Sequence, residues 1–255
     1  MSVNELIASL LALWLPFVRI LAFFLFCPIL DNRALPRKAR IILAFLLSMI
    51  IAPVLEEKIV INDLMNANTL LLTGEQIIWG WLFGQMLWWV FWALQTAGAI
   101  LSMNMGLGMA VMNDPANGSS TMVISQIIFI WSGLLFFIAD GHLLLVSILY
   151  KGFIYWPIGK AITIPSLHAL ASGLGWILSS AVLLALPTVF IMLLVQGTFG
   201  LLSRVAPQLN LFALGFPISM LFGLLCFIVL SSHIGEHYLQ LTNRVIALFD
   251  QLREA

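Results

Sequence analysis

Charged residues are scarce in this sequence. Asp, Glu, Lys and Arg together make up 9% of its 255 residues, and 62% of the residues are hydrophobic, whereas soluble domains carry about 25% charged residues. A soluble fold of this size would lack the polar side chains that cover a water-exposed surface. The formal net charge is zero, which argues against nucleic-acid binding, because that function needs a clustered basic face. The composition therefore predicts a membrane-type protein.

Catalytic motifs and cysteine frameworks are also lacking. The sequence contains no GxSxG, HExxH, phosphate-binding-loop or dinucleotide fingerprint, and Cys27 and Cys226 show no metal-ligand spacing. His233, Glu236 and His237 match the HxxEH pattern of inverted zinc proteases. A catalytic zinc needs a third protein ligand, and little chain follows to supply it. We interpret the pattern as a solvated helix end and expect no enzyme activity, no cofactor and no metal.

Long apolar runs dominate what is present. A helix crosses a bilayer with about 20 apolar residues, and six segments reach or approach this length. They predict an all-α fold of membrane-type helical hairpins, because the second segment is short and Pro187 interrupts the fifth. A short polar tail is expected after residue 230. The segments are 6–30, 39–54, 70–101, 122–150, 167–202 and 211–230.

The third segment presents two contrasting helix faces. Gly80 and Gly84 have the GxxxG spacing that lets another helix approach closely. Trp81, Trp88 and Trp92 share a different face, and tryptophans in mid-helix favour protein packing over an interfacial belt. So small a chain offers neither face an evident partner. We therefore predict that the protein is not a stable monomer.

Ionisable groups inside apolar segments need a specific explanation, because a charge at the bilayer centre costs about 2.5–3.5 kcal/mol on insertion scales. Arg19 lies too far from either end of its segment to reach the interface, so it is expected to face a partner or a water-filled path. Asp140 and His142 flank a glycine and mark either a functional or assembly site or a break between two helices. Arg204 is a fourth candidate for a buried assembly charge.

Methionine and glycine concentrate in residues 102–122, SMNMGLGMAVMNDPANGSSTM. Glycine and Asn-Asp-Pro sequences break helices, and methionine fills irregular gaps and repacks easily. Irregular backbone at membrane depth survives only when it is buried in protein or lines a cavity. These features predict a plug that closes a channel and can move aside; an ordinary exposed loop is the alternative.

The sequence RVAPQLNLFALGFP at residues 204–217 resembles the C-terminal signature of the FliR/SctT family of type III secretion export-gate proteins. Weaker similarities lie at residues 26–28, at 36–40, and at Glu75 with 113–115, so the resemblance covers the whole chain. The Gly-Phe-Pro ending favours the flagellar branch, and an injectisome SctT-type subunit is the alternative. The signature residues are Pro207, Gln208, Asn210, Phe212, Gly215, Phe216 and Pro217.

The resemblance implies a place in an export gate. FliR-like proteins join FliP and FliQ in a closed helical cone of the bacterial inner membrane at the flagellar basal body. The cone is raised toward the periplasmic side, has FlhB at its cytoplasmic entrance and passes unfolded flagellar proteins. The resemblance also implies a FliP-like part at 1–165, a FliQ-like hairpin and tail at 166–255, and a plug at 106–122. The plug residues that it implies are Gly106, Leu107, Gly108, Met109, Ala110, Val111, Met112, Asn113, Asp114, Pro115, Ala116, Asn117 and Met122. A secondary transporter would show an internal repeat with paired broken helices, which we do not find in the sequence.

Overall fold

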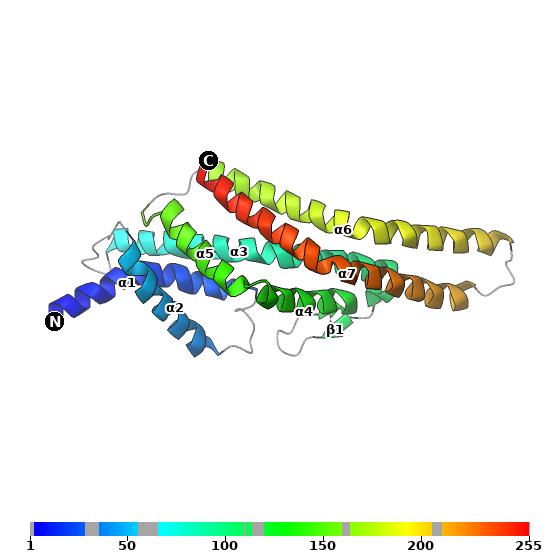
Figure 1. Ribbon diagram of the computed structural model, residues 1–255, viewed down its shortest axis with the longest axis horizontal. Coiled ribbons are helices and arrows are strands. Elements are labelled where there is room, and N and C mark those ends of the chain that lie inside the picture. The colour runs from blue at the N-terminus through cyan, green and yellow to red at the C-terminus, as the bar shows by residue number, and fades with distance from the viewer. Residues whose placement is uncertain are drawn as a thin grey trace. The chain divides into compact units, whose positions relative to one another are not determined.

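The computed structural model describes residues 3–28, 36–55, 66–109, 111–113, 120–159, 164–205 and 211–254. These residues are almost entirely helical, which confirms the predicted all-α fold (Figure 1). Two 3-10 turns, η1 (Ala52–Val54) and η2 (Leu107–Met109), and an antiparallel ribbon of β1 (Val111–Asn113) and β2 (Ser120–Met122) accompany the helices. The helices are α1 (Val3–Leu25), α2 (Arg37–Ile51), α3 (Ala67–Asn104), α4 (Val123–Ile138), α5 (Gly141–Tyr155), α6 (Ile164–Val205) and α7 (Leu211–Glu254).

The helices differ from the six predicted segments in two places. The fourth segment is two helices, α4 and α5, which are separated at Asp140, where the backbone adopts a left-handed conformation with φ of 52°. The polar tail predicted after residue 230 is wrong, because α7 continues to Glu254. This part of α7 stays helical because apolar side chains recur every three or four residues and are buried. These side chains are Ile234, Tyr238, Leu241, Val245, Leu248 and Phe249.

The chain forms two compact units that do not follow sequence order. Unit 1 contains residues 1–88, 140–169 and 245–255, and unit 2 contains residues 89–139 and 170–244. The helices α3, α6 and α7 therefore contribute to both units. The division at residue 165 into a FliP-like and a FliQ-like part rests on the resemblance and stays a prediction.

In unit 1, α1 packs closely against α3 at the two glycines of the GxxxG sequence. A Cβ atom at Gly80 would overlap the carbonyl oxygen of Arg19, and one at Gly84 would lie 3.0 Å from the carbonyl oxygen of Phe23. The predicted close helix approach is therefore confirmed. The expectation that this face has no partner within the chain is wrong, because α1 of the same chain covers it.

An aromatic cluster fills the core of unit 1 and joins α3, α5 and the end of α7. The ring centroids of Trp79 and Trp156 lie 5.0 Å apart, and those of Phe83 and Phe249 lie 5.2 Å apart. Gly152 lets α5 approach α3, because a Cβ atom there would lie 2.6 Å from the Phe83 ring. Such ring pairs stabilise a core by about 0.5–1.5 kcal/mol beyond their area burial.

In unit 2, glycines again permit close helix packing. A Cβ atom at Gly98 of α3 would lie 3.0 Å from the Cα atom of Ser125 in α4. Gly173 of α6 faces the ring of Trp89 in α3, and a Cβ atom there would overlap that ring. The second part of α3 thus contacts α4 at Gly98 and α6 at Trp89.

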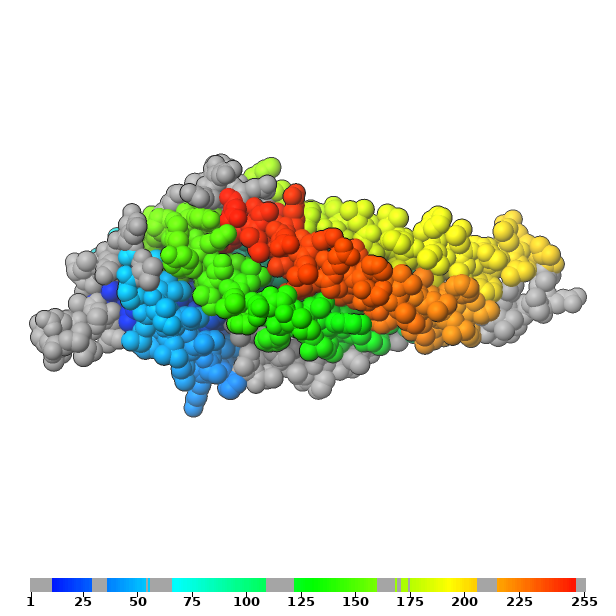
Figure 2. All heavy atoms as spheres, in the orientation of Figure 1, coloured from blue at the N-terminus to red at the C-terminus, as the bar shows by residue number. Residues whose placement is uncertain are grey.

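The helices α6 and α7 run antiparallel within unit 2. Trp176 lines a cavity together with Arg244, and Ile191 lines an adjoining cavity together with Phe222. Residues 206–210, which join the two helices, lie outside the described residues. Figure 2 shows the yellow side chains of α6 beside the orange side chains of α7 over much of this length. The pair therefore forms an extended two-helix surface.

Among the described residues, three helices are long and apolar enough to cross a bilayer, namely Ala67–Asn104, Ala171–Val205 and Gly215–Asp250. Taken together as one broken span, α4 and α5 would add a fourth. The most apolar stretch of Ala67–Asn104 is 67% buried inside the chain, whereas those of the other two are 28% and 17% buried. Lipid or partner subunits must therefore cover most of the apolar surface of α6 and α7.

Candidate functional site

The predicted plug begins where α3 ends. The chain turns at Gly106, whose φ of 77° lies in the left-handed region that favours glycine. The turn η2 follows and contacts β2, and Val111 of β1 pairs opposite Met122 of β2. Both strands contact α4. The sequence predicted irregular backbone here, but the ribbon provides hydrogen-bond partners for part of it.

Much of the predicted plug lies beyond what the structure describes, so the methionine seal stays a prediction. Leu107, Gly108 and Met122 are half-buried, and the neighbouring Met103 is exposed. Four plug residues are described by their backbone alone, namely Met109, Val111, Met112 and Asn113. Five others lie wholly outside the described residues, namely Ala110, Asp114, Pro115, Ala116 and Asn117.

The start of the plug is held against α7. The Met105 side chain is 0% exposed, and a Cβ atom at Gly223 of α7 would overlap it. Two helical turns before Gly223, Phe216 of α7 borders Gly106. Its ring lies 3.0 Å from where a Cβ atom of Gly106 would be. Gly106 at the start of the plug and Gly223 in α7 thus permit the contacts with Phe216 and Met105.

Hydrogen bonds fix both ends of the segment. The Nε2 group of Gln196 in α6 donates to the backbone carbonyl of Asn104, at 3.0 Å. Shortly after β2, the hydroxyl of Ser125 donates to the backbone carbonyl of Gln95, at 2.9 Å. All four residues belong to unit 2. The two ends of the predicted plug are therefore anchored to the framework of α3, α4, α6 and α7.

Arg19 is 0% exposed and lies in the interior of unit 1. Its Nε group donates to Oε1 of Gln76 in α3, at 2.7 Å, and its Nη1 group donates to the carbonyls of Gly152 and Trp156, at 3.2 and 2.8 Å. The guanidinium carbon also lies 4.5 Å from the ring centroid of Phe153. The partners of this buried cation are therefore hydrogen-bond acceptors and an aromatic ring of the same chain.

The other three candidate charges are exposed in this chain. Asp140 and His142 flank the break between α4 and α5, which matches the alternative interpretation of a helix break reaching solvent. Arg204 lies in the last turn of α6 and is also exposed. Each of the three stands at a helix boundary and is not buried by this chain, and their role as assembly charges stays a prediction.

The family signature is described only in part. Pro207, Gln208 and Asn210 lie outside the described residues, and Phe212 is in α7 but its side chain is not among those described. Gly215, Phe216 and Pro217 belong to the first turns of α7. Phe216 is 51% exposed and its ring borders Gly106, so the signature contacts the start of the predicted plug.

The HxxEH pattern lies in the middle of α7 and not at a helix end. His233 and Glu236 are exposed, and His237 is half-buried. The Nδ1 atom of His233 lies 3.1 Å from the carbonyl of Val229 and 2.9 Å from the hydroxyl of Ser232. Within the described ranges, no group of three or more His, Cys, Asp and Glu side chains could hold a metal ion.

Sequence reasoning missed several residues that position this framework. Gln76 is fully buried and holds Arg19; a lone amide within an apolar run is the signal that could have indicated it. Lys151 pairs with Asp250 at 3.0 Å, and the Tyr155 hydroxyl lies 3.1 Å from the same carboxylate. This cluster joins α5 to the end of α7, and no local pattern predicts it because the partners are far apart in the sequence.

Comparison with known proteins gives the family. The model of the family described as "Bacterial export proteins, family 1" matches residues 10–245. This chain belongs to that family. Among relatives of this bacterial export family, the flagellar biosynthetic protein FliR of Pectobacterium carotovorum subsp. carotovorum is 34% identical over 211 residues, which cover 82% of this chain and 80% of the relative. The resemblance carried by residues 204–217 is therefore confirmed.

The family relatives include proteins of two names. FliR of Bacillus subtilis (strain 168) is 27% identical over 235 residues, 90% of this chain and 89% of the relative. The surface presentation of antigens protein SpaR of Salmonella typhimurium is 27% identical over 219 residues, 85% of this chain and 80% of the relative. Both alignments cover most of this chain.

Proposed function

We propose that this chain is a core export-gate subunit of a flagellar type III secretion apparatus. The observation that carries the proposal is the family match over residues 10–245 together with FliR relatives that align over most of the chain. The exposed apolar surface of α6 and α7 supports a subunit that is completed by membrane and partners. Scarce charge and the absence of a known catalytic motif in the sequence favour a passage for proteins over an enzyme.

In this proposal the chain joins FliP and FliQ homologues in the bacterial inner membrane, with FlhB at the cytoplasmic entrance, and unfolded flagellar proteins pass through the assembled channel. Residues 106–122 close the channel at rest. The anchoring of Met105 and Gly106 on α7 supports this assignment, because a plug needs fixed ends and a movable middle. Obligate partner interfaces resemble a domain core cut in half, which suits the apolar faces of α6 and α7.

Co-expression tests the assembly. The tagged full-length chain, produced with the FliP and FliQ homologues of the same bacterium and released in mild detergent, should elute as one large complex on mass measurement. The chain produced alone should retain much detergent and lipid. A monodisperse monomer that ignores both homologues would contradict the proposal.

An injectisome subunit is the second candidate, favoured by the SpaR relative at an identity equal to that of the Bacillus subtilis FliR. Deleting the gene in the bacterium that encodes it separates the two. Loss of secreted flagellar filament protein, restored by the gene in trans, is the expected result. Normal filament secretion with loss of a host-directed effector would assign the chain to an injectisome.

A further inference from the structure

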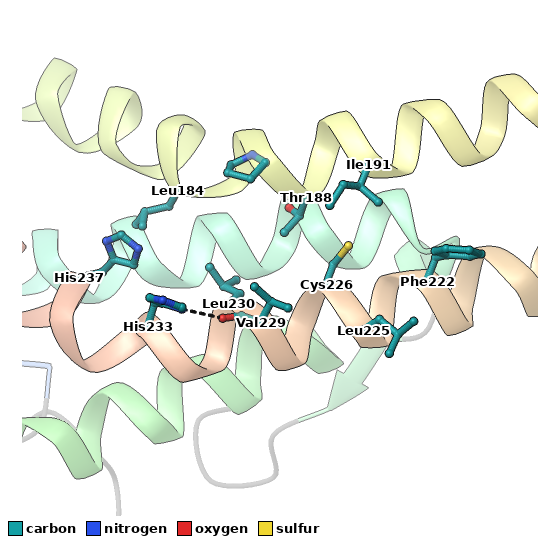
Figure 3. A pocket seen from close by; sticks show the side chains of 11 residues that line it. Leu184, Thr188, Ile191, Phe222, Leu225, Cys226, Val229, Leu230, His233 and His237 are labelled. Carbon is teal, nitrogen blue, oxygen red and sulfur yellow. Dashed lines mark hydrogen bonds between the residues drawn. The ribbon is translucent and has the colours of Figure 1, made fainter.

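Two adjoining cavities form a groove between α6 and α7 of unit 2. The first has a volume of about 390 Å³ and the second of about 410 Å³. Leu184, Pro187 and His237 line both cavities, so one continues into the other. Figure 3 shows the lining side chains of the first cavity projecting from the facing sides of the two helices.

The groove changes from apolar to basic along its length. Ile191, Phe222 and Leu225 line the far part of the first cavity. The Thr188 hydroxyl donates to the carbonyl of Ala185 at 2.7 Å, so its donor is satisfied within α6. The second cavity is lined instead by Trp176, Ser180, Gln240 and Arg244 in addition to His237. Among the described residues, no Asp or Glu lines either cavity.

We propose that this groove binds one anionic phospholipid, with an acyl chain along the first cavity and the phosphate against Arg244 and His237. Arginine suits phosphate because its planar guanidinium donates two parallel hydrogen bonds. Trp176 stands at the same end, and tryptophan is enriched where hydrocarbon meets headgroups. Charge and polarity thus orient the lipid in one direction only.

The groove is long enough for an acyl chain. The helical rise from Phe222 to His237 is about 22 Å at about 1.5 Å per residue, which exceeds the roughly 15 Å that is half of a hydrocarbon core about 30 Å thick.

Native mass spectrometry tests the proposal on the full chain. The purified protein, exchanged into detergent to remove bound lipid, is titrated with palmitoyl-oleoyl phosphatidylglycerol or with the phosphatidylcholine that carries the same chains. One phosphatidylglycerol should be retained in preference to phosphatidylcholine. The substitution Arg244→Gln should lower phosphatidylglycerol retention by up to about fivefold, the usual limit for one exposed ion pair, and leave phosphatidylcholine unchanged.

Two further variants test the acyl chain. Leu225→Trp and Ile191→Trp each add bulk to the wall of the apolar cavity at an exposed position, so both should lower retention of both lipids. The matched controls are Arg204→Gln and Phe190→Trp, exposed residues of α6 outside the groove, and they should bind lipid like the parent. Circular dichroism confirms that each variant is folded.

Three results would overturn the proposal. The first is an unchanged preference for phosphatidylglycerol in Arg244→Gln. The second is parent-like lipid retention in both tryptophan variants. The third is occupancy by a partner chain, detected when the variant Leu225→Cys crosslinks to a co-expressed subunit while the complex retains no phosphatidylglycerol. The titration uses the isolated chain, so its outcome does not depend on whether the proposed export function is correct.

Discussion

Arg19 of α1 reaches across unit 1 to Trp156, the residue that follows the last residue of α5, and donates to its backbone carbonyl at 2.8 Å. The same Nη1 group bonds the carbonyl of Gly152, one turn earlier, at 3.2 Å. The last carbonyls of a helix lack partners within the helix, and the helix dipole favours a cation there. Arg19 therefore fastens α1 to the end of α5 while Gln76 fastens it to α3.

Replacing Arg19 by Met should destabilise unit 1. The Met side chain fills a similar space but leaves the acceptors of Gln76, Gly152 and Trp156 without their donor. Removing one partner of a buried polar group costs about 1–3 kcal/mol, and more for a charged one. We expect the midpoint temperature of thermal unfolding of the detergent-solubilised protein to fall by about 6 °C or more. Arg37→Met, at an exposed position at the start of α2, is the control, and an equal change in both variants would refute this role.

Gly80 and Gly74 of α3 provide a matched pair of substitutions. Alanine at Gly80 would overlap the backbone of α1, whereas a Cβ atom at Gly74 meets nothing within 4 Å. Gly80→Ala should therefore destabilise the protein by about 1–3 kcal/mol through overpacking. Gly74→Ala should be neutral or stabilise it by up to about 1 kcal/mol, because alanine favours a helix. Unfolding of the two variants in a denaturing detergent series measures both changes in the free energy of unfolding. A Gly80→Ala variant as stable as the parent would show that α1 does not pack against α3 at Gly80.

The sequence predicted those features that depend on local pattern. Apolar runs gave the helices, the GxxxG spacing gave the close approach at Gly80, and Asp140 with its neighbouring glycine gave the helix break as one alternative. The interpretation of residues 231–255 as a tail was wrong, because His233, Glu236 and Asp250 lower the mean hydropathy of this stretch while the buried stripe of α7 continues along it.

Features that depend on tertiary contact could not be predicted from the sequence. Gln76 lies 57 residues from Arg19, and the carbonyl of Trp156 lies 137 residues from it. The contact of Met105 with Gly223 likewise joins segments that no local periodicity relates. Such pairings follow from how α1, α5 and α7 pack, and a single sequence taken by itself carries no signal for them.

The contact between Met105 and Gly223 should control how tightly the gate closes. Gly223→Ala places a methyl group where the Met105 side chain lies, so the start of the plug must move. We expect assembled complexes carrying Gly223→Ala to leak more ions than the parent. Met105→Ala in the same chain removes the clash and should restore part of the closure. Gly215→Ala is the control in α7, because a Cβ atom there meets nothing within 4 Å. If the Gly215→Ala complex leaks as many ions as the Gly223→Ala complex, this mechanism is excluded.

The middle of residues 106–122 should close the channel by packing and not by charge. Asp114 is the only ionisable residue in this range, so an electrostatic gate has little to act with. Methionine and glycine offer a deformable seal that a moving polypeptide can displace, and many weak dispersion contacts together can still exclude ions. Replacing residues 107–121 by a Gly-Ser sequence of equal length keeps the anchors at Met105, Gly106 and Ser125.

This replacement should leave the complex assembled but conductive. The measurement is ion flux into vesicles that hold the purified complex, compared with the parent at equal protein content. Asp114→Asn is the matched control, because it removes the only charge of the segment and preserves its length; its flux should stay close to the parent value. If the packing explanation holds, conductance follows the loss of methionine and is insensitive to the loss of Asp114. If the complex with the Gly-Ser replacement shows the same ion flux as the parent, other residues close the channel.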